Sequence, residues 1–100
     1  MIRSKKITNA ARDQDCTLNI LGVCNFDPAT VVFCHFPDES HGIGIKASDA
    51  SGGFGCSACH DAIDNRVRSE EFLERSDWYM RRSQTSTVQK LLEMGVLKVA

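Results

Sequence analysis

The chain has 100 residues, a formal net charge of -1 and five cysteines. A chain this short supports one small core and rarely two, so we expect a single domain. The nearly balanced charge disfavours a protein that coats nucleic acid without selectivity, because such proteins carry a large positive excess. A local basic surface is still compatible with this composition.

The N-terminal segment MIRSKKITNAARDQDC contains basic side chains but no apolar run typical of a secretory signal. No stretch of the sequence is long and apolar enough to span a membrane, so we expect a cytoplasmic protein. Disulfides do not persist in a reducing compartment, and five cysteines in a short intracellular chain therefore favour metal binding. Residues 1–12 are interpreted as a basic lead-in without an apolar pattern that demands burial.

The sequence of the first half of the domain predicts two strands and a loop. Residues 17–23, TLNILGV, are typical of a short strand and turn, and residues 30–36, TVVFCHF, of a β-branched and aromatic strand. Alternation along the second strand places Cys34 and His35 on opposite sides. Residues 38–55 are rich in Gly, Ser and Asp, and they predict an ordered loop over a site.

The second half predicts helices. One follows the cysteine pair in CSACHDAID, and another begins at Ser69 and runs to about Met94, where Gly95 is the stop signal. Residues 96–99, VLKV, predict a short closing strand. The stripe expected to be buried on the long helix is Leu73, Met80, Val88, Leu91 and Leu92. The class expected from these elements is α+β.

Four of the cysteines form two pairs. Cys56 and Cys59 have the spacing with which two thiolates reach one tetrahedral zinc ion, although a redox dithiol has the same spacing. Cys16 and Cys24 form a second pair upstream, with an apolar segment between them. We therefore predict that all four hold one structural zinc ion. Alternatively, Cys16 and Cys24 are small buried hydrophobes, or Cys34 or His60 replaces one ligand.

The residues that could replace a ligand have other interpretations as well. His60 follows the second pair directly, and Asp64 lies four residues later, so on a helix both share a face and a hard divalent cation could bridge them. In the ordinary alternative, His60 is a further zinc ligand or a surface residue, and Asp64 pairs with Arg68. Cys34 adjoins His35 on the predicted strand, where neighbours point to opposite faces, so a core thiol is expected rather than an activated nucleophile.

The order of strand histidine, long loop, cysteine pair and helix histidine resembles the HNH nucleases of the ββα-metal class. Over residues 9 to 98 the chain is also similar to the small prophage-encoded nucleases of the YbcO type, with its paired cysteines, VVFCHF strand, KASDASGG loop and CSACHDAID segment. The resemblance implies a small zinc-stabilised ββα-metal core with a long C-terminal helix in residues 13–100. It also implies a bacterial host for the predicted cytoplasmic protein.

The resemblance further implies roles for single residues. In that family a strand histidine is the general base, a polar loop residue orients it or binds metal, and a helix histidine binds the catalytic cation. The matching residues are His35, Asp49 and His60, and Asp64 stands where some members carry another metal ligand. Asp49 takes the place of the asparagine that names the motif. Magnesium or manganese suits a site with carboxylates better than a thiolate site.

The function implied is a metal-dependent endonuclease that hydrolyses phosphodiester bonds of nucleic acid, with DNA as the expected partner. Phosphate contacts are assigned to Lys46, Arg66 and Arg68. Two other functions remain open. One is a non-catalytic zinc module that binds nucleic acid, and the other is a zinc-stabilised adaptor that binds proteins.

Overall fold

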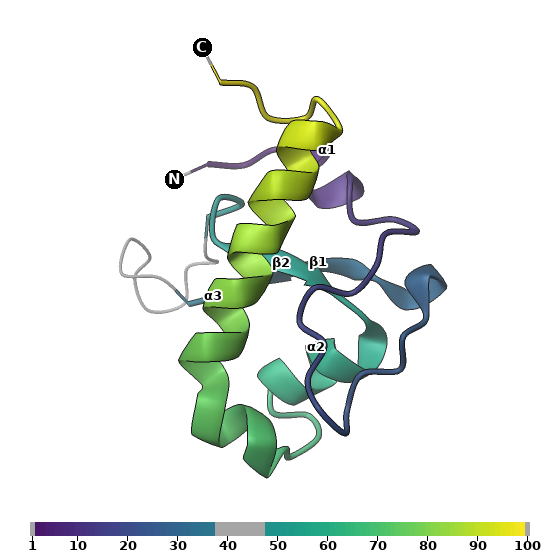
Figure 1. Cartoon of the computed structure of the whole chain (residues 1–100), viewed down its shortest axis with the longest axis vertical. Helices are drawn as coiled ribbons and strands as arrows, with labels where there is room; N and C mark the ends of the chain where they lie inside the picture. Colours follow the sequence, from purple (N-terminus) through teal and green to yellow (C-terminus); the bar gives the residue numbers. More distant parts are fainter. Residues whose placement is uncertain (1, 38–47, 100) are drawn as a thin grey trace.

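The computed structural model describes residues 2–37 and 48–99 and shows a small α+β fold (Figure 1). A two-stranded sheet and a long C-terminal helix dominate it. In chain order the elements are α1 (Lys5–Asn9), the 3-10 turn η1 (Pro28–Thr30), β1 (Val32–His35), β2 (Gly52–Gly55), α2 (Ser57–Ile63) and α3 (Glu70–Glu93). No helix in these two described ranges is both long and apolar enough to cross a membrane.

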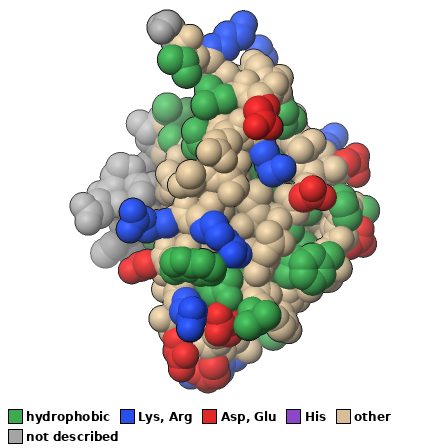
Figure 2. Space-filling model, viewed as in Figure 1, with side chains coloured by type: hydrophobic (Ala, Val, Ile, Leu, Met, Phe, Trp, Pro, Cys, Tyr) green, Lys and Arg blue, Asp and Glu red, His purple; other side chains and the backbone are tan. Residues whose placement is uncertain are grey.

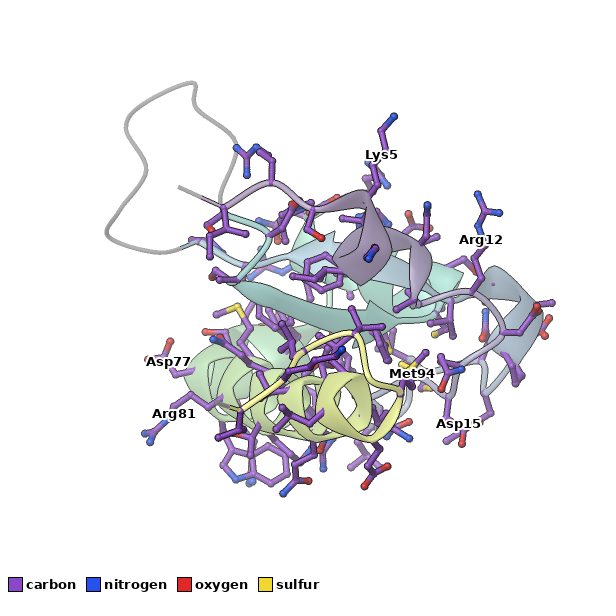
Figure 3. All side chains as sticks on the ribbon, turned by 90° about the horizontal axis from the view of Figure 1, so that it is seen from above. Lys5, Arg12, Asp15, Asp77, Arg81 and Met94 are labelled. Carbon is purple, nitrogen blue, oxygen red and sulfur yellow. The ribbon has the colours of Figure 1, made fainter. Side chains whose placement is uncertain are left out.

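The sheet lies between two helical layers. Figure 3 shows Lys5 and Arg12 on the α1 side of the sheet and Asp77 and Arg81 of α3 on the opposite side. β1 and β2 are antiparallel, and His35 lies opposite Gly52. The predicted alternation along β1 is confirmed, because Cys34 is fully buried in the core while the neighbouring His35 is only partly buried.

The segment predicted as the end of a loop is in fact a buried strand. Residues 52–55, GGFG, form β2, which the sequence does not suggest because glycine is depleted in strands. The tertiary reason is the close approach of α3. A Cβ atom on Gly53 would lie 2.2 Å from the Oγ of Ser83, so only glycine lets helix and strand pack this closely.

The ends of α3 are as predicted, but only Leu91 and, in part, Met80 of the predicted stripe are buried. Ser69 caps the helix by accepting the N–H of Phe72 at 3.1 Å, and Gly95 follows its end with a φ of 75°. Leu73, Val88 and Leu92 of the predicted stripe are exposed by 38–41%. The buried residues are Phe72, Tyr79, Ser83, Thr87 and Leu91. A kink at Arg75, with φ of -128° and ψ of 27°, separates the first turn from the rest of this face.

Buried hydroxyl groups select this face of α3. The Oγ1 of Thr17 lies 2.6 Å from the Oγ of Ser83 and 3.1 Å from the Oγ1 of Thr87, and it also donates to the Phe54 carbonyl. The Oγ1 of Thr87 accepts the N–H of Phe54 at 3.1 Å. These buried polar groups therefore satisfy one another, and the helix turns its small hydroxyl residues rather than its leucines toward β2.

Two further expectations from the sequence are wrong. Residues 17–23 contain the predicted turn but no strand, because their backbone bonds to β2 only through the Thr17 N–H, at the Phe54 carbonyl, and Asn19 has a positive φ of 45°. Residues 96 and 97 form a bend, and residues 98 and 99 have no regular structure, so the predicted closing strand is not present there. The N-terminal segment contributes to the core as well, since Ile7 and Ala11 are buried, although its sequence shows no pattern that demands burial.

Candidate metal centre and catalytic cleft

The four paired cysteines converge on one point. The sulfur atoms of Cys16, Cys24, Cys56 and Cys59 all lie within 4.8 Å of one another, and those of Cys24 and Cys56 are 3.8 Å apart. Sulfur atoms about 2.3 Å from a tetrahedral zinc ion are about 3.8 Å from one another. The cluster could therefore bind a metal such as zinc. Neither Cys34 nor His60 belongs to it, so the alternatives with a replaced ligand are not favoured.

The local backbone directs amide N–H groups at the sulfurs. Cys56 caps the start of α2, and its Sγ accepts the N–H of Cys59 at 3.4 Å. In the upstream turn the Sγ of Cys16 accepts the N–H of Asn19, also at 3.4 Å. Such hydrogen bonds favour the thiolate form, which is the form that binds a metal.

The thiols interact so strongly that they cannot all ionise together. The hydrogen bond from the Cys59 thiol lowers the pKa of Cys16 to about 5, against the effect of burial. Burial raises the pKa of Cys24 to about 11. The pKa of Cys59 is raised by its hydrogen bond to Cys16 and by burial. A divalent cation at the centre compensates the negative charge of several thiolates, so the chemistry of this donor set fits zinc.

The strand histidine is held in place by two side chains. The Nε2 of His35 lies 2.6 Å from the Oδ1 of Asp49. Phe33 supports the imidazole edge-on, with ring centroids 5.2 Å apart and an interplanar angle of 75°. The side chain of His35 remains 18% exposed, so a solvent molecule or substrate can still reach the ring.

Asp49 is the hub of these contacts. Its Oδ2 accepts the backbone N–H of Ser4 at 2.6 Å, and its own N–H donates to the Ile2 carbonyl at 2.8 Å. Burial alone would raise the pKa of Asp49, but the hydrogen bonds from His35 and Ser4, with the charge of Arg3 3.8 Å away, lower it overall. Asp49 is therefore an ionised, doubly hydrogen-bonded acceptor that orients the imidazole.

The second predicted pair is on α2 and just beyond it. The Nε2 of His60 lies 3.1 Å from the Oδ2 of Asp64, which follows the last residue of α2. Arg66 contacts the same Asp64 oxygen at 3.4 Å and the Oδ1 of Asp61 at 3.1 Å. Both members of the pair are partly exposed, His60 by 30% and Asp64 by 38%.

One cleft brings three of the four predicted catalytic residues together. It has a volume of about 580 Å³ and is lined by His35, His60 and Asp64. Residues on and just after α1 also line this cleft, among them Thr8, Asn9 and Arg12. Asp49 does not line it and contacts it only through His35. Among the described residues, only the four cysteines form a group of three or more metal ligands with all donor atoms within 4.8 Å.

Of the residues assigned to phosphate binding, both arginines contact acidic side chains. Arg66 is engaged with Asp61 and Asp64, and the Nε of Arg68 lies 2.6 Å from Glu70. Lys46 lies outside the described residues. Figure 2, which views the α3 side, shows positive and negative side chains intermixed and no histidine among the described residues on that face. This face therefore does not present an unbroken basic surface.

Sequence reasoning missed three contributors to the cleft. Arg12 lines it beside His35 and could have been singled out from the basic residues near the N-terminus. Phe33 could have been singled out because it shares a strand face with His35. The contact of Ser4 has no sequence signal, because a backbone N–H is present in nearly every residue.

The chain is similar to known proteins over most of its length. The sequence profile of a family described as "Putative nuclease YbcO" matches residues 5–96. The chain is 43% identical over 62 residues to proteins of that description from Escherichia coli K12 and from Enterobacteria phage 82. The aligned segment covers 61% of this chain and only 65% of each relative.

A solved structure is similar over more of the chain. It is described as a putative bacteriophage protein from Escherichia coli K-12 substrain MG1655, and it has 30% sequence identity and a TM-score of 0.69. The match covers 88% of this chain and 98% of that structure. The profile match over residues 5–96 includes the four clustered cysteines and every described residue of the cleft, and this chain therefore belongs to the YbcO family.

Proposed function

We propose that this protein is a metal-dependent endonuclease of the HNH, or ββα-metal, type, which hydrolyses phosphodiester bonds of nucleic acid, with DNA as the expected substrate. One observation carries the proposal: His35, oriented by Asp49, opens into the cleft that also holds His60 and Asp64. The names of the curated relatives, which include a phage protein, support a nuclease of phage or prophage origin.

His35 acts as the general base in this mechanism. A neutral imidazole that donates its Nε2 proton to the Asp49 carboxylate carries its lone pair on Nδ1. Nδ1 then takes a proton from a water molecule as that water attacks the phosphorus atom. Asp49 holds the ring in this tautomer and stabilises the imidazolium that forms, as a carboxylate behind a catalytic histidine does elsewhere.

His60 and Asp64 are the residues that would hold the catalytic cation. Two ligands about 2.1 Å from a magnesium ion and at right angles to each other are about 3 Å apart, and their donor atoms are 3.1 Å apart here. A divalent cation bound there would stabilise the charge that develops on the phosphate and on the leaving oxygen. Arg66, which now contacts Asp64, would lose that contact when a cation takes the oxygen and would keep its contact with Asp61.

The cysteine cluster positions this machinery. Cys59 immediately precedes His60 on α2, and Cys16 and Cys24 tie the upstream turn to the start of the same helix. Zinc held by the four sulfurs would therefore fix the helix histidine relative to the strand histidine. Thr8, Asn9 and Arg12, on the other wall of the cleft, are placed to bind the substrate phosphate.

The test is cleavage of plasmid DNA by the purified protein with Mg²⁺ or Mn²⁺. His35→Ala and Asp64→Asn should abolish cutting, whereas Asp77→Asn, on the exposed part of α3, should cut like the unchanged protein. Zinc content and circular dichroism of each variant show that the fold is kept. Cutting that survives in His35→Ala would refute the mechanism.

Two other results would favour the alternative functions. Absence of cutting together with metal-independent retention of DNA would favour a non-catalytic zinc module that binds nucleic acid. Absence of both, together with a stoichiometric protein partner, would favour an adaptor.

A further inference from the structure

A second hollow adjoins the catalytic cleft. It has a volume of about 400 Å³ and shares His35 and Asp64 with the cleft. Its remaining lining is mostly apolar and comes from the residues just after β1, from the last residue of α2 and from the first half of α3. The apolar residues that line it are Phe36, Pro37, Ile63, Phe72, Leu73 and Met80.

The cleft and the hollow share His35 and Asp64, but their other lining residues differ in polarity. The cleft has Thr8, Asn9 and Arg12 from the α1 side, which suit a phosphate. The hollow has an apolar wall from α3, and Leu73 is left 41% exposed at this wall although it is large and apolar. A nucleotide has the same division, because its phosphate is charged and the faces of its base are apolar.

We propose that the hollow receives one unpaired nucleobase of the substrate strand, next to the phosphate bound in the catalytic cleft. This inference rests on the proposed nuclease function and names its substrate class: single-stranded nucleic acid, or a duplex with an unpaired base at the cut. A base inside a duplex is paired and stacked, so it reaches the hollow only after it has been extruded.

The lining also indicates how selective the hollow is. Besides His35 and Asp64, which belong to the catalytic pairs, the residues that line it offer one side-chain hydroxyl, that of Ser76. Recognition of a particular base needs several hydrogen bonds to its edge, whereas contact with its face is available to every base. The hollow therefore distinguishes unpaired from paired bases, and it discriminates little among the four bases.

Binding without added magnesium or manganese tests the hollow separately from catalysis. The probes are a short single strand, a strand of equal length whose sugars lack bases, and a blunt duplex of the same sequence, followed by fluorescence anisotropy. The unchanged protein should bind the complete single strand several-fold more tightly than either of the others, since covering one face of a base with the exposed Leu73 removes apolar surface from water.

A matched pair of variants on α3 assigns the effect to the hollow. Leu73→Ser should remove the preference for the complete strand, whereas Leu92→Ser should keep it. The two leucines are exposed to nearly the same extent, 41% and 38%, and Leu92 does not line the hollow. Circular dichroism and zinc content establish that both variants are folded.

The outcomes separate this inference from the nuclease proposal. A base-dependent preference that Leu73→Ser removes supports the hollow even if Mg²⁺ or Mn²⁺ induces no cutting, in which case only the catalytic proposal fails. Equal binding of all three probes, with duplex and single strand cut at equal rates, overturns the hollow and leaves the nuclease in place. The inference is also overturned if Leu73→Ser and Leu92→Ser show the same preference for the complete single strand.

Discussion

The backbone N–H of Ser4 donates to the Oδ2 of Asp49 at 2.6 Å, across 45 positions of sequence. The other oxygen of this carboxylate is 2.6 Å from the Nε2 of His35. One carboxylate therefore connects the N-terminal segment to the imidazole that lines the cleft. Asp49 is buried, and neither it nor Ser4 lines the cleft. The orientation of His35 therefore depends on a contact made outside the cleft.

Asp49→Asn should lower kcat of the proposed nuclease by about 10²-fold or more. The carboxylate accepts two N–H groups, but an amide offers one oxygen and one NH₂ group, so one of the two donors would face another donor. We expect His35 to change to the tautomer protonated on Nδ1, which cannot act as the base. The ¹⁵N chemical shifts of the imidazole report the tautomer, and Asp77→Asn is the control. An unchanged tautomer with full activity would contradict this role of Asp49.

Asp49 should also contribute to stability in a pH-dependent way. Its pKa in the folded protein is lowered, so it favours folding when ionised, and this contribution is fully present above the ordinary carboxyl pKa of about 3.9. The contribution is lost as the pH falls through the lower pKa of the folded state. The difference in free energy of unfolding between the unchanged protein and Asp49→Asn should therefore be fully present at about pH 5 and shrink below about pH 4. Denaturant unfolding at several pH values from about 5 downward measures it, and a difference that grows between about pH 5 and about pH 3 would contradict the sign.

Removal of zinc should unfold the domain, because metal binding supplies part of the folding free energy of so small a core. We expect one zinc per chain, and Cys59→Ser should lose that zinc together with the cooperative thermal transition. Cys34→Ala is the matched control, since Cys34 is equally buried but lies outside the sulfur cluster. It should retain zinc with a loss of about 1–2 kcal/mol from the small cavity. Native mass spectrometry and thermal circular dichroism measure both quantities, and full zinc occupancy in Cys59→Ser would refute the assignment.

Arg12 should contribute more to nucleic-acid binding than Arg68. Arg12 lines the cleft, whereas the guanidinium of Arg68 already contacts Glu70. Arg12→Gln should weaken binding several-fold and reduce the slope of log Kd against log salt by about 1, the loss expected for one phosphate contact. Arg68→Gln should change the slope less. Anisotropy titrations at several salt concentrations provide the slopes, and a larger effect of Arg68→Gln would restore the assignment made from the sequence.

Much of the candidate site follows from short-range sequence patterns. The spacing of Cys56 and Cys59 directs two thiols to one point, and alternation along β1 separates Cys34 from His35. The signals that set the two ends of α3 are also local, because a serine cap and a glycine with positive φ each act within one helical turn. Each of these features depends on residues only a few positions apart.

The features that the sequence could not reveal depend on contacts between distant segments. GGFG packs as a strand because its neighbours leave no room for side chains at the glycines: a Cβ on Gly53 would lie 2.2 Å from Ser83 of α3, and one on Gly55 would lie 2.7 Å from Cys34. The buried face of α3 contains Ser83 and Thr87 because Thr17, more than 60 positions earlier, supplies their hydrogen-bond partner. Propensity and periodicity carry no information about such partners.

By itself, therefore, the sequence determined which four cysteines could hold a metal ion, the side of β1 that carries His35 and the extent of the long helix, since local geometry decides each of them. Only the tertiary structure decided that Ser4 holds Asp49, that Arg12 lines the cleft and that Leu73 faces an open hollow. The reason is physical: close packing and the pairing of buried polar groups are set when remote segments meet, and they leave no periodic trace along the chain.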